Sequence, residues 1–187
     1  MTTVAIVYHS GYGHTAVLAD KVAEGVRDAG QTPVLLKIEN AAQDFAPLIE
    51  QITQADAVVF GAPTYMGDVS GVFKVFADAT ASAFFTGAWK DKLAAGFTNS
   101  HSFAGDKGHA LESLTILAAQ HGMNWINLGL GDLLDQRREV LGGALDLQQH
   151  RGLAGVTHAF GDLVGQDGGV AVAGVINDGD LGHCREP

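Results

Sequence analysis

Apolar residues in the first two thirds of the chain follow two alternating patterns. Residues 4–8 form a continuous apolar run, as expected for a parallel strand that is covered on both faces. Residues 15–29 then place Leu18, Val22 and Val26 on one side of a helix that ends at Gly30. The same alternation predicts strands at 34–38, 57–61, 93–97 and 124–128, and helices at 47–53, 69–79 and 111–121. Five such strands with intervening helices predict an α/β fold, a three-layer sandwich with a parallel sheet between helices.

The pattern changes after Leu130. Residues 131–187 contain no lysine and are rich in glycine, and only 145–149 and 156–164 have weak helical patterning. A fold of this class normally closes with a helix after the fifth strand, and the pattern does not locate one. We therefore divide the chain into a domain at 1–130 and a divergent Gly-rich C-terminal segment at 131–187, expected to be irregular. A loop-rich extension, an interface segment and a non-homologous terminus from a changed reading frame are three interpretations of that segment.

Composition narrows the function classes. The formal charge of −10, without a Lys/Arg cluster, disfavours nucleic-acid binding. No apolar stretch reaches the roughly 18 residues of a membrane span, and the N-terminus has no basic segment before an apolar core. Cys184 is the single cysteine, so no internal disulfide can form, and we expect a cytoplasmic protein. The eight histidines lack a compact ligand spacing, so we expect no metal site.

The loop HSGYGHT, residues 9–15, leads from the first strand into the first helix. A helix N-terminus offers unpaired N–H groups and a partial positive charge, so such a loop is suited to an anion. The hydroxyls of Ser10 and Thr15 and the imidazole of His14 favour a terminal phosphate, whose oxygens need several donors. A triphosphate-binding loop is excluded because the required lysine is missing.

Two alternatives remain for this loop. Gly11, Gly13 and Ala16 fit the GxGxxG/A dinucleotide template, and Glu39 could bind the ribose hydroxyl of such a ligand. A strand-to-helix turn that binds no ligand is the other alternative, because glycine matches of this kind are weak signals.

The third and fourth predicted strands also end in polar loops. In open α/β sheets, ligands bind outside the carboxyl ends of the strands, so these loops belong with the first one. After the third strand come Pro63, Thr64, Tyr65, Met66 and Gly67. After the fourth come Thr98, Asn99, Ser100 and His101.

Four segments resemble one family in order and spacing: YHSGYGHT, GAPTYMGDVSGVFKVFAD, WKDKLAAGFTNS and LAAQHGM. The family is that of the flavodoxin-like NAD(P)H-dependent FMN reductases and NAD(P)H:quinone oxidoreductases, especially the tryptophan-repressor-binding-protein type. The resemblance covers about residues 3–130 and not the tail. It implies a flavodoxin-like sheet with strand order 2-1-3-4-5 and FMN across the ends of strands one, three and four.

The resemblance also implies roles for individual residues. The FMN phosphate would be held by Ser10, Tyr12, Gly13, His14 and Thr15. The isoalloxazine would be bracketed near N5 by Pro63, Thr64, Tyr65, Met66 and Gly67. Backbone donors to its pyrimidine end would come from Thr98, Asn99, Ser100 and His101.

Phe84 and His121 occupy the places of an aromatic residue and a histidine that line the family's substrate pocket, in some relatives from a neighbouring subunit. Phe84 stands where tryptophan is common, and Tyr65 and Met66 stand where arginine and phenylalanine occur, so the acceptor stays open. Each of these residues also has a structural interpretation: His14 as a helix-start residue, His121 as a dipole-stabilised helix end, and Phe84 as core.

The implied activity is that of an FMN-dependent oxidoreductase. It would transfer two electrons from NAD(P)H through FMN to a quinone or similar acceptor, in an assembly that the family often forms as a homodimer or homotetramer. A flavodoxin-type single-electron carrier is the alternative from another class, since the acidic charge would suit basic redox partners. An NAD-binding Rossmann domain is the third interpretation.

Overall fold

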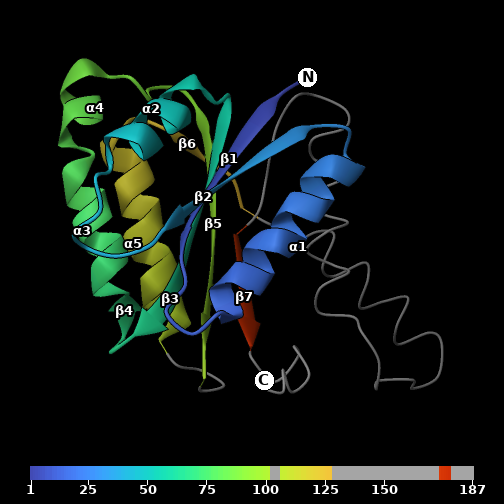
Figure 1. The fold of residues 1–187 in the computed structure, drawn as a ribbon, viewed down its shortest axis with the longest axis vertical. Coiled ribbons are helices and arrows are strands. Elements are labelled where there is room, and N and C mark those ends of the chain that lie inside the picture. The colour runs from blue at the N-terminus through green and yellow to red at the C-terminus, as the bar shows by residue number, and fades with distance from the viewer. Residues whose placement is uncertain (102–105, 128–172, 178–187) are drawn as a thin grey trace.

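The central sheet joins five parallel strands in the order β2-β1-β3-β5-β6 (Figure 1). The strands are β1 (Thr3–His9), β2 (Thr32–Ile38), β3 (Ala57–Tyr65), β5 (Leu93–Ser100) and β6 (Asn124–Trp125). The structure, a computed structural model, describes residues 1–101, 106–127 and 173–177. Counted along the chain, these five strands have the predicted order 2-1-3-4-5, and the flavodoxin-like fold class is confirmed.

Two further strands were not predicted from the sequence. The short strand β4 (Asp68–Val69) folds back antiparallel on β3, and β7 (Ala173–Asn177) runs parallel to β5. The pairing of β6 stops after it has matched Leu93 and Ala94 of β5, while β7 pairs with Gly96–Ser100. The fifth strand was predicted to run to residue 128, but β6 ends at Trp125 because β7 is paired with the remainder of that edge of β5.

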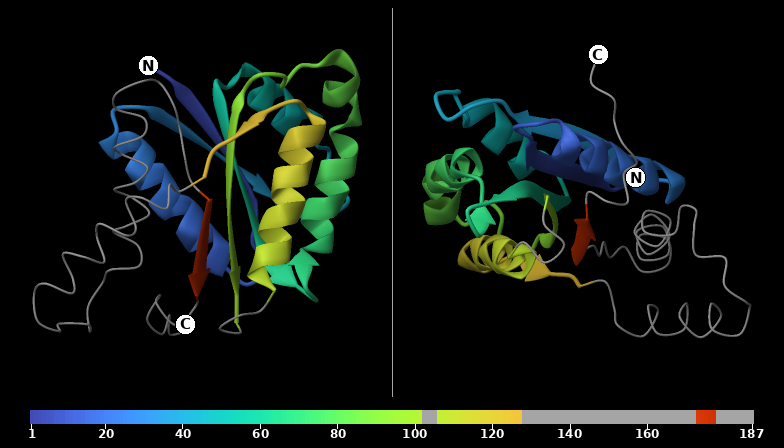
Figure 2. Two further views of the ribbon diagram at one scale, coloured as in Figure 1. Left: turned by 180° about the vertical axis from the view of Figure 1, so that it is seen from behind. Right: turned by 90° about the horizontal axis from the view of Figure 1, so that it is seen from below.

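Helices cover both faces of the sheet, as predicted (Figure 2). The helix α1 (His14–Asp28) packs on one face, and its buried side chains contact Val4 and Ile6 of β1. The other face is covered by α2 (Ala46–Gln54), α3 (Gly71–Ala79), α4 (Ala81–Thr86) and α5 (Lys107–Gln120). Ala5 and Val7 of β1 point to this second face, because successive strand residues alternate between faces.

Two helices begin two or more residues away from the predicted start, and the other predicted helix boundaries differ from the structure by at most one residue. The helix predicted at 69–79 begins at Gly71, because the Ser70 hydroxyl caps it by accepting a hydrogen bond from the Phe73 N–H at 3.4 Å. The helix predicted at 111–121 begins one turn earlier, at Lys107. Among the described residues, no helix has both the length and the apolar character that a membrane crossing requires.

Candidate functional site

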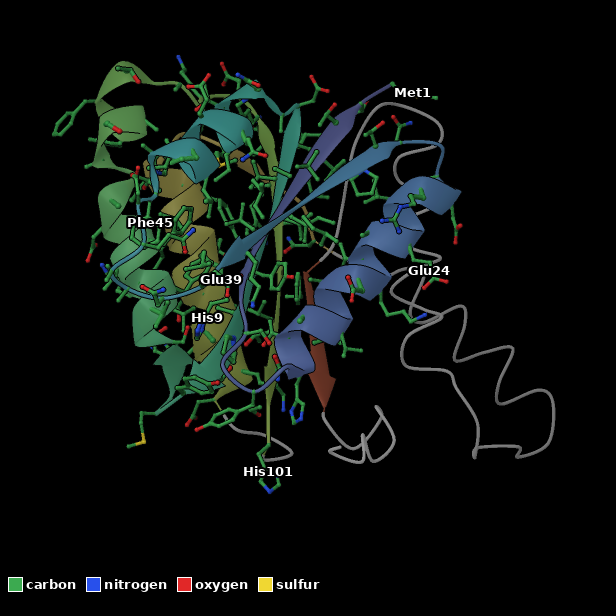
Figure 3. All side chains as sticks on the ribbon, viewed as in Figure 1. Met1, His9, Glu24, Glu39, Phe45 and His101 are labelled. Atoms are coloured by element: carbon green, nitrogen blue, oxygen red, sulfur yellow. The ribbon has the colours of Figure 1, made fainter. Side chains whose placement is uncertain are left out.

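The loops predicted to bind a ligand meet at the carboxyl edge of the sheet, where β1, β3 and β5 end side by side. Hydroxyl groups join these ends. The Thr15 hydroxyl of α1 donates to Asn99 Oδ1 of β5 at 2.8 Å. Thr64 Oγ1 of β3 and Thr98 Oγ1 of β5 lie 2.8 Å apart and share a hydrogen bond. His9 and His101 in Figure 3 mark this edge.

The first loop forms an open cradle at the start of α1. The Ser10 hydroxyl accepts a hydrogen bond from the Ala16 N–H at 3.1 Å, while Tyr12, Gly13 and His14 are exposed. Gly13 is the N-cap residue and makes no side-chain cap, and the first turn of α1 carries no acidic side chain. Backbone N–H groups, hydroxyls and the positive end of the helix thus converge without a competing carboxylate, and this donor set fits a phosphate.

The β3–β4 hairpin brings an aromatic side chain onto this cradle. Met66 (φ 51°) and Gly67 (φ 89°) are the two central residues of the turn, and both have the positive φ of a type I′ hairpin. The Tyr65 hydroxyl lies over Gly11, where an added Cβ would be 2.5 Å from its oxygen. Tyr65 also packs edge-on against Tyr12, with ring centroids 6.1 Å apart. Burial raises the pKa of the Tyr65 phenol, so the ring presents a neutral hydroxyl.

Two side chains at this edge were not predicted from the sequence. His9 ends β1, and its Nδ1 lies 2.7 Å from Ser70 Oγ, so it ties the strand to the start of α3. Burial, with a smaller contribution from Lys37, lowers the pKa of His9. The sequence signal that could have identified His9 was its position directly before Ser10.

Lys107 is the second missed residue. Its side chain is buried, with 3% exposure, and its Nζ donates to Ser100 Oγ at 3.0 Å. The predicted helix start at 111 had placed Lys107 in a loop, where a lysine is expected to be solvated. The glycine-rich stretch AGDKG, residues 104–108 in the loop after a strand, was the sequence signal for a role of Lys107 other than a solvated one.

Phe84 and His121 lie together, at the opposite edge of the sheet. Their ring centroids are 6.2 Å apart, and both line a groove of about 380 Å³ between α3, α4 and α5. His121 follows the last residue of α5 and is separated from β6 by Gly122 and Met123, and Phe84 lies in α4, shortly before β5 begins. Both residues therefore lie near the amino ends of the strands, and the groove runs from them along α3 and α5 to Asp68 and Val69 of the β3–β4 hairpin.

His121 is held as a neutral ring. The Thr80 hydroxyl donates to the Ala77 carbonyl at 2.7 Å, so Thr80 Oγ1, 2.8 Å from His121 Nε2, accepts the Nε2–H. Among the described residues, His121 Nδ1 is the buried side-chain atom without a hydrogen-bond partner. Burial lowers the pKa of His121, in agreement with a neutral ring.

The residues at the carboxyl edge fit FMN better than they fit a metal ion. The cradle suits its phosphate, and the strand ends beside it supply hydroxyl and backbone groups for the polar rim of the ring. Glu39, the residue that a dinucleotide ribose would require, is paired with Lys37 at 2.7 Å. In the part of the chain that the structure describes, no three His, Cys, Asp or Glu side chains gather as metal ligands.

Comparisons with known proteins agree with the flavodoxin-like fold of this chain. A family model described as NADPH-dependent FMN reductase matches residues 9–130. Flavodoxin FldP of Pseudomonas aeruginosa is 43% identical over 130 residues, which are 70% of this chain and 68% of the relative. An NAD(P)H dehydrogenase (quinone) of Azorhizobium caulinodans is 29% identical over 196 residues, covering 97% of this chain and 95% of the relative.

Solved structures share the fold. A WrbA-like flavodoxin from Agrobacterium tumefaciens superposes with a TM-score of 0.62 at 43% identity, covering 67% of this chain and 77% of that chain. An archaeal flavodoxin superposes with a TM-score of 0.54 at 17% identity, covering 67% and 78% of the two chains. At the lower identity the likeness concerns the fold alone.

Proposed function

Because the chain belongs to the NADPH-dependent FMN reductase family, we propose that it transfers two electrons from NAD(P)H through FMN to a quinone or a similar acceptor. FMN is the cofactor of this oxidoreductase family, and this favours the phosphate interpretation of HSGYGHT over the dinucleotide one. The observation that carries the proposal is the meeting of the α1 cradle, the β3–β4 hairpin and the end of β5 at one edge.

In this proposal the chain binds and orients the cofactor. Ser10, Tyr12, Gly13, His14 and Thr15 hold the phosphate end, and the residues Pro63, Thr64, Tyr65, Met66 and Gly67 border the ring. Thr98, Asn99, Ser100 and His101 contact the pyrimidine end. Bound FMN supplies hydride chemistry, so the chain needs to align donor and acceptor in turn and needs no side-chain base.

Phe84 and His121 enter the proposal through a neighbouring subunit. Their edge of the sheet is opposite to the cradle of their own chain, so they would complete the acceptor pocket only in a dimer or tetramer. The exposed Phe84 ring is suited to stack on a quinone. Use of NAD(P)H as the reductant also makes a cytoplasmic location part of the proposal.

A mixing experiment tests the shared pocket. Phe84→Ala should slow quinone reduction without changing the Kd for FMN. Activity should return when this variant is assembled together with a Ser10→Ala/Thr15→Ala chain, because one subunit then keeps an intact cradle and the other an intact Phe84. A monomer in sedimentation that still reduces quinones would contradict the shared pocket.

A flavodoxin-type single-electron carrier is the second candidate function, and the 43% identical flavodoxin of Pseudomonas aeruginosa favours it. The acidic charge of −10 would complement a basic protein partner. A carrier would exchange single electrons with that partner and would turn over no small substrate.

One spectroscopic experiment distinguishes the reductase from the single-electron carrier. The protein is purified with FMN, desalted, and mixed anaerobically with NADPH and then with a benzoquinone. Retained flavin absorbance that NADPH bleaches and the quinone restores is the result expected of the reductase. Retained absorbance that NADPH does not bleach would assign the carrier, and loss of all flavin on desalting would contradict both.

A further inference from the structure

Lys107 is a buried cation at the start of a helix. Its side chain is 3% exposed, it carries a positive charge, and it is the first residue of α5, where the helix dipole is itself positive. Burying a cation costs free energy, and placing it at the positive end of a helix adds to that cost. A cation held at this depth acts strongly on any charge that appears near it, because electrostatic interactions are little screened there.

The contacts of Lys107 place its ammonium group at the carboxyl edge. Its Nζ donates to the hydroxyl of Ser100, the last residue of β5. The neighbouring Asn99 accepts from Thr15 of the cradle helix. Asp106, directly before Lys107, approaches the hairpin turn, with its Oδ2 3.7 Å from where a Cβ on Gly67 would lie. The start of α5 therefore lies between the end of β5 and the hairpin.

We propose that Lys107 stabilises the negative charge that FMN acquires at its pyrimidine end on two-electron reduction. This inference rests on the proposed function, in which Thr98, Asn99, Ser100 and His101 hold that end. A hydride from NAD(P)H brings two electrons and one proton to the neutral oxidised flavin and leaves NAD(P)⁺, so one negative charge remains on the cofactor. Lys107 is a positioning residue that acts across the Ser100 hydroxyl.

The charge on Lys107 acts differently on the two redox forms. Oxidised FMN has a neutral ring, so the cation contributes little to its binding. Reduced FMN carries the ring charge in a partly buried setting, where electrostatic interactions are much less screened than in water. The cation therefore binds the reduced form more tightly and raises the two-electron midpoint potential above the value that an otherwise acidic protein would impose.

The test compares the affinities of the two redox forms in Lys107→Met. The Kd values for oxidised and reduced FMN are measured by anaerobic fluorescence titration, and the midpoint potential by equilibration with a reference dye. We expect the ratio of reduced to oxidised Kd to rise at least tenfold, which lowers the two-electron potential by about 30 mV. Lys90→Met, at an exposed lysine, makes the same change in net charge and should leave both quantities unchanged.

Lys107→Arg keeps the charge and should hold the potential close to that of the unmodified protein. A Lys107→Met protein that binds FMN with an unchanged ratio of Kd values would overturn the proposal. Equal loss of affinity for both forms would overturn it too, because that result indicates a purely structural role.

The unmodified protein provides a measurement that does not depend on a variant folding. Its bound FMN should have a two-electron potential at or above that of free FMN. A potential about 30 mV or more below free FMN, equivalent to tenfold weaker binding of the reduced form, would overturn the proposal. A chain that binds neither redox form would contradict the cofactor assignment itself, and so would be distinguished from a failure of the role of Lys107.

Discussion

The two edges of the sheet are built from different chemistry. At the carboxyl edge, buried polar side chains join separate elements, such as Thr15 with Asn99 and Lys107 with Ser100. At the amino edge, the fully buried Trp89 stacks on His121, with ring centroids 4.3 Å apart. Buried polar groups cost free energy unless they are satisfied, whereas buried aromatic surface contributes stability directly. The comparison assigns cofactor binding to the carboxyl edge and a buried aromatic cluster to the amino edge.

Removing the indole at the amino edge should produce the largest change. Trp89 is 0% exposed, and its Nε1–H donates to Thr53 Oγ1 at 3.0 Å. Trp89→Ala removes this hydrogen bond and leaves a cavity, so the free energy of unfolding should fall by about 3–5 kcal/mol in urea denaturation. The Kd for FMN, measured under conditions where the variant is folded, should stay within about twofold because the carboxyl edge is untouched. A large loss of FMN affinity in folded protein would break the division between the edges.

Removing the hydroxyls of the cradle should chiefly weaken FMN binding. In Ser10→Ala/Thr15→Ala, FMN should bind at least tenfold more weakly, because each hydrogen bond to a charged group contributes about 1.5–3 kcal/mol. Thr86→Ala is the matched control: its hydroxyl bonds to main-chain carbonyls of α4 at the amino edge, and its loss should leave FMN binding unchanged. Unchanged FMN affinity in the double variant, measured by flavin fluorescence quenching, would remove the phosphate assignment of this loop.

The contact between Gly11 and Tyr65 offers a sharper test within the carboxyl edge. A Cβ on Gly11 would be 2.5 Å from the Tyr65 hydroxyl oxygen and 3.5 Å from the ring carbon that bears it. Gly11→Ala should therefore displace the Tyr65 ring and weaken FMN binding about tenfold, within the range of about 1–3 kcal/mol for overpacking. Tyr65→Phe in the same chain removes the clashing oxygen and should restore most of the affinity. If Tyr65→Phe did not restore the affinity, the clash with the Tyr65 hydroxyl would not be the cause of the weaker FMN binding.

Long apolar runs carried most of the fold prediction. The runs at 4–8 and 57–61 are apolar at every position except Gly61, as a doubly covered strand requires, and both form central strands. The strand β7 was missed although it lies in a continuous apolar run at 170–176, because the glycine-rich composition of 131–187 favoured irregular structure. The strand β6 was predicted too long because its own pattern does not show that β7 pairs with the rest of that edge of β5.

The residues of the site also divide into those that the sequence predicted and those that it did not. Ser10 and Thr15 were identifiable because a helix N-terminus needs local donors and acceptors, which a loop motif records. His9 and Lys107 were missed because their importance arises from contacts with Ser70 and Ser100 and from burial, which only the folded chain defines. Phe84 and His121 show a further limit: the family resemblance singled out both residues, but it did not indicate the edge of the sheet on which they lie.

The smallest expected effect is a pH dependence of stability that originates at His121. Burial lowers its pKa below the ordinary 6.5, so the unfolded chain takes up a proton before the folded one does. The contribution of His121 to stability is therefore fully present above that ordinary pKa and is lost as the pH falls toward the lowered one. The loss is at most about 1.4 kcal/mol per pH unit for this group.

His121→Gln, which cannot titrate, should flatten this dependence. Urea denaturation from about pH 7.5 to about pH 5.5 should show a shallower fall in the free energy of unfolding than in the unmodified chain. A remaining slope is expected from His9 at the carboxyl edge, since burial lowers its pKa as well. Repeating the measurement with bound FMN separates the contributions of His9 and His121. FMN should change the part of the pH dependence that is due to His9, because His9 adjoins the cradle. The difference in slope between His121→Gln and the unmodified chain should stay the same. If FMN abolished that difference as well, the two edges would be coupled through the sheet instead of acting independently.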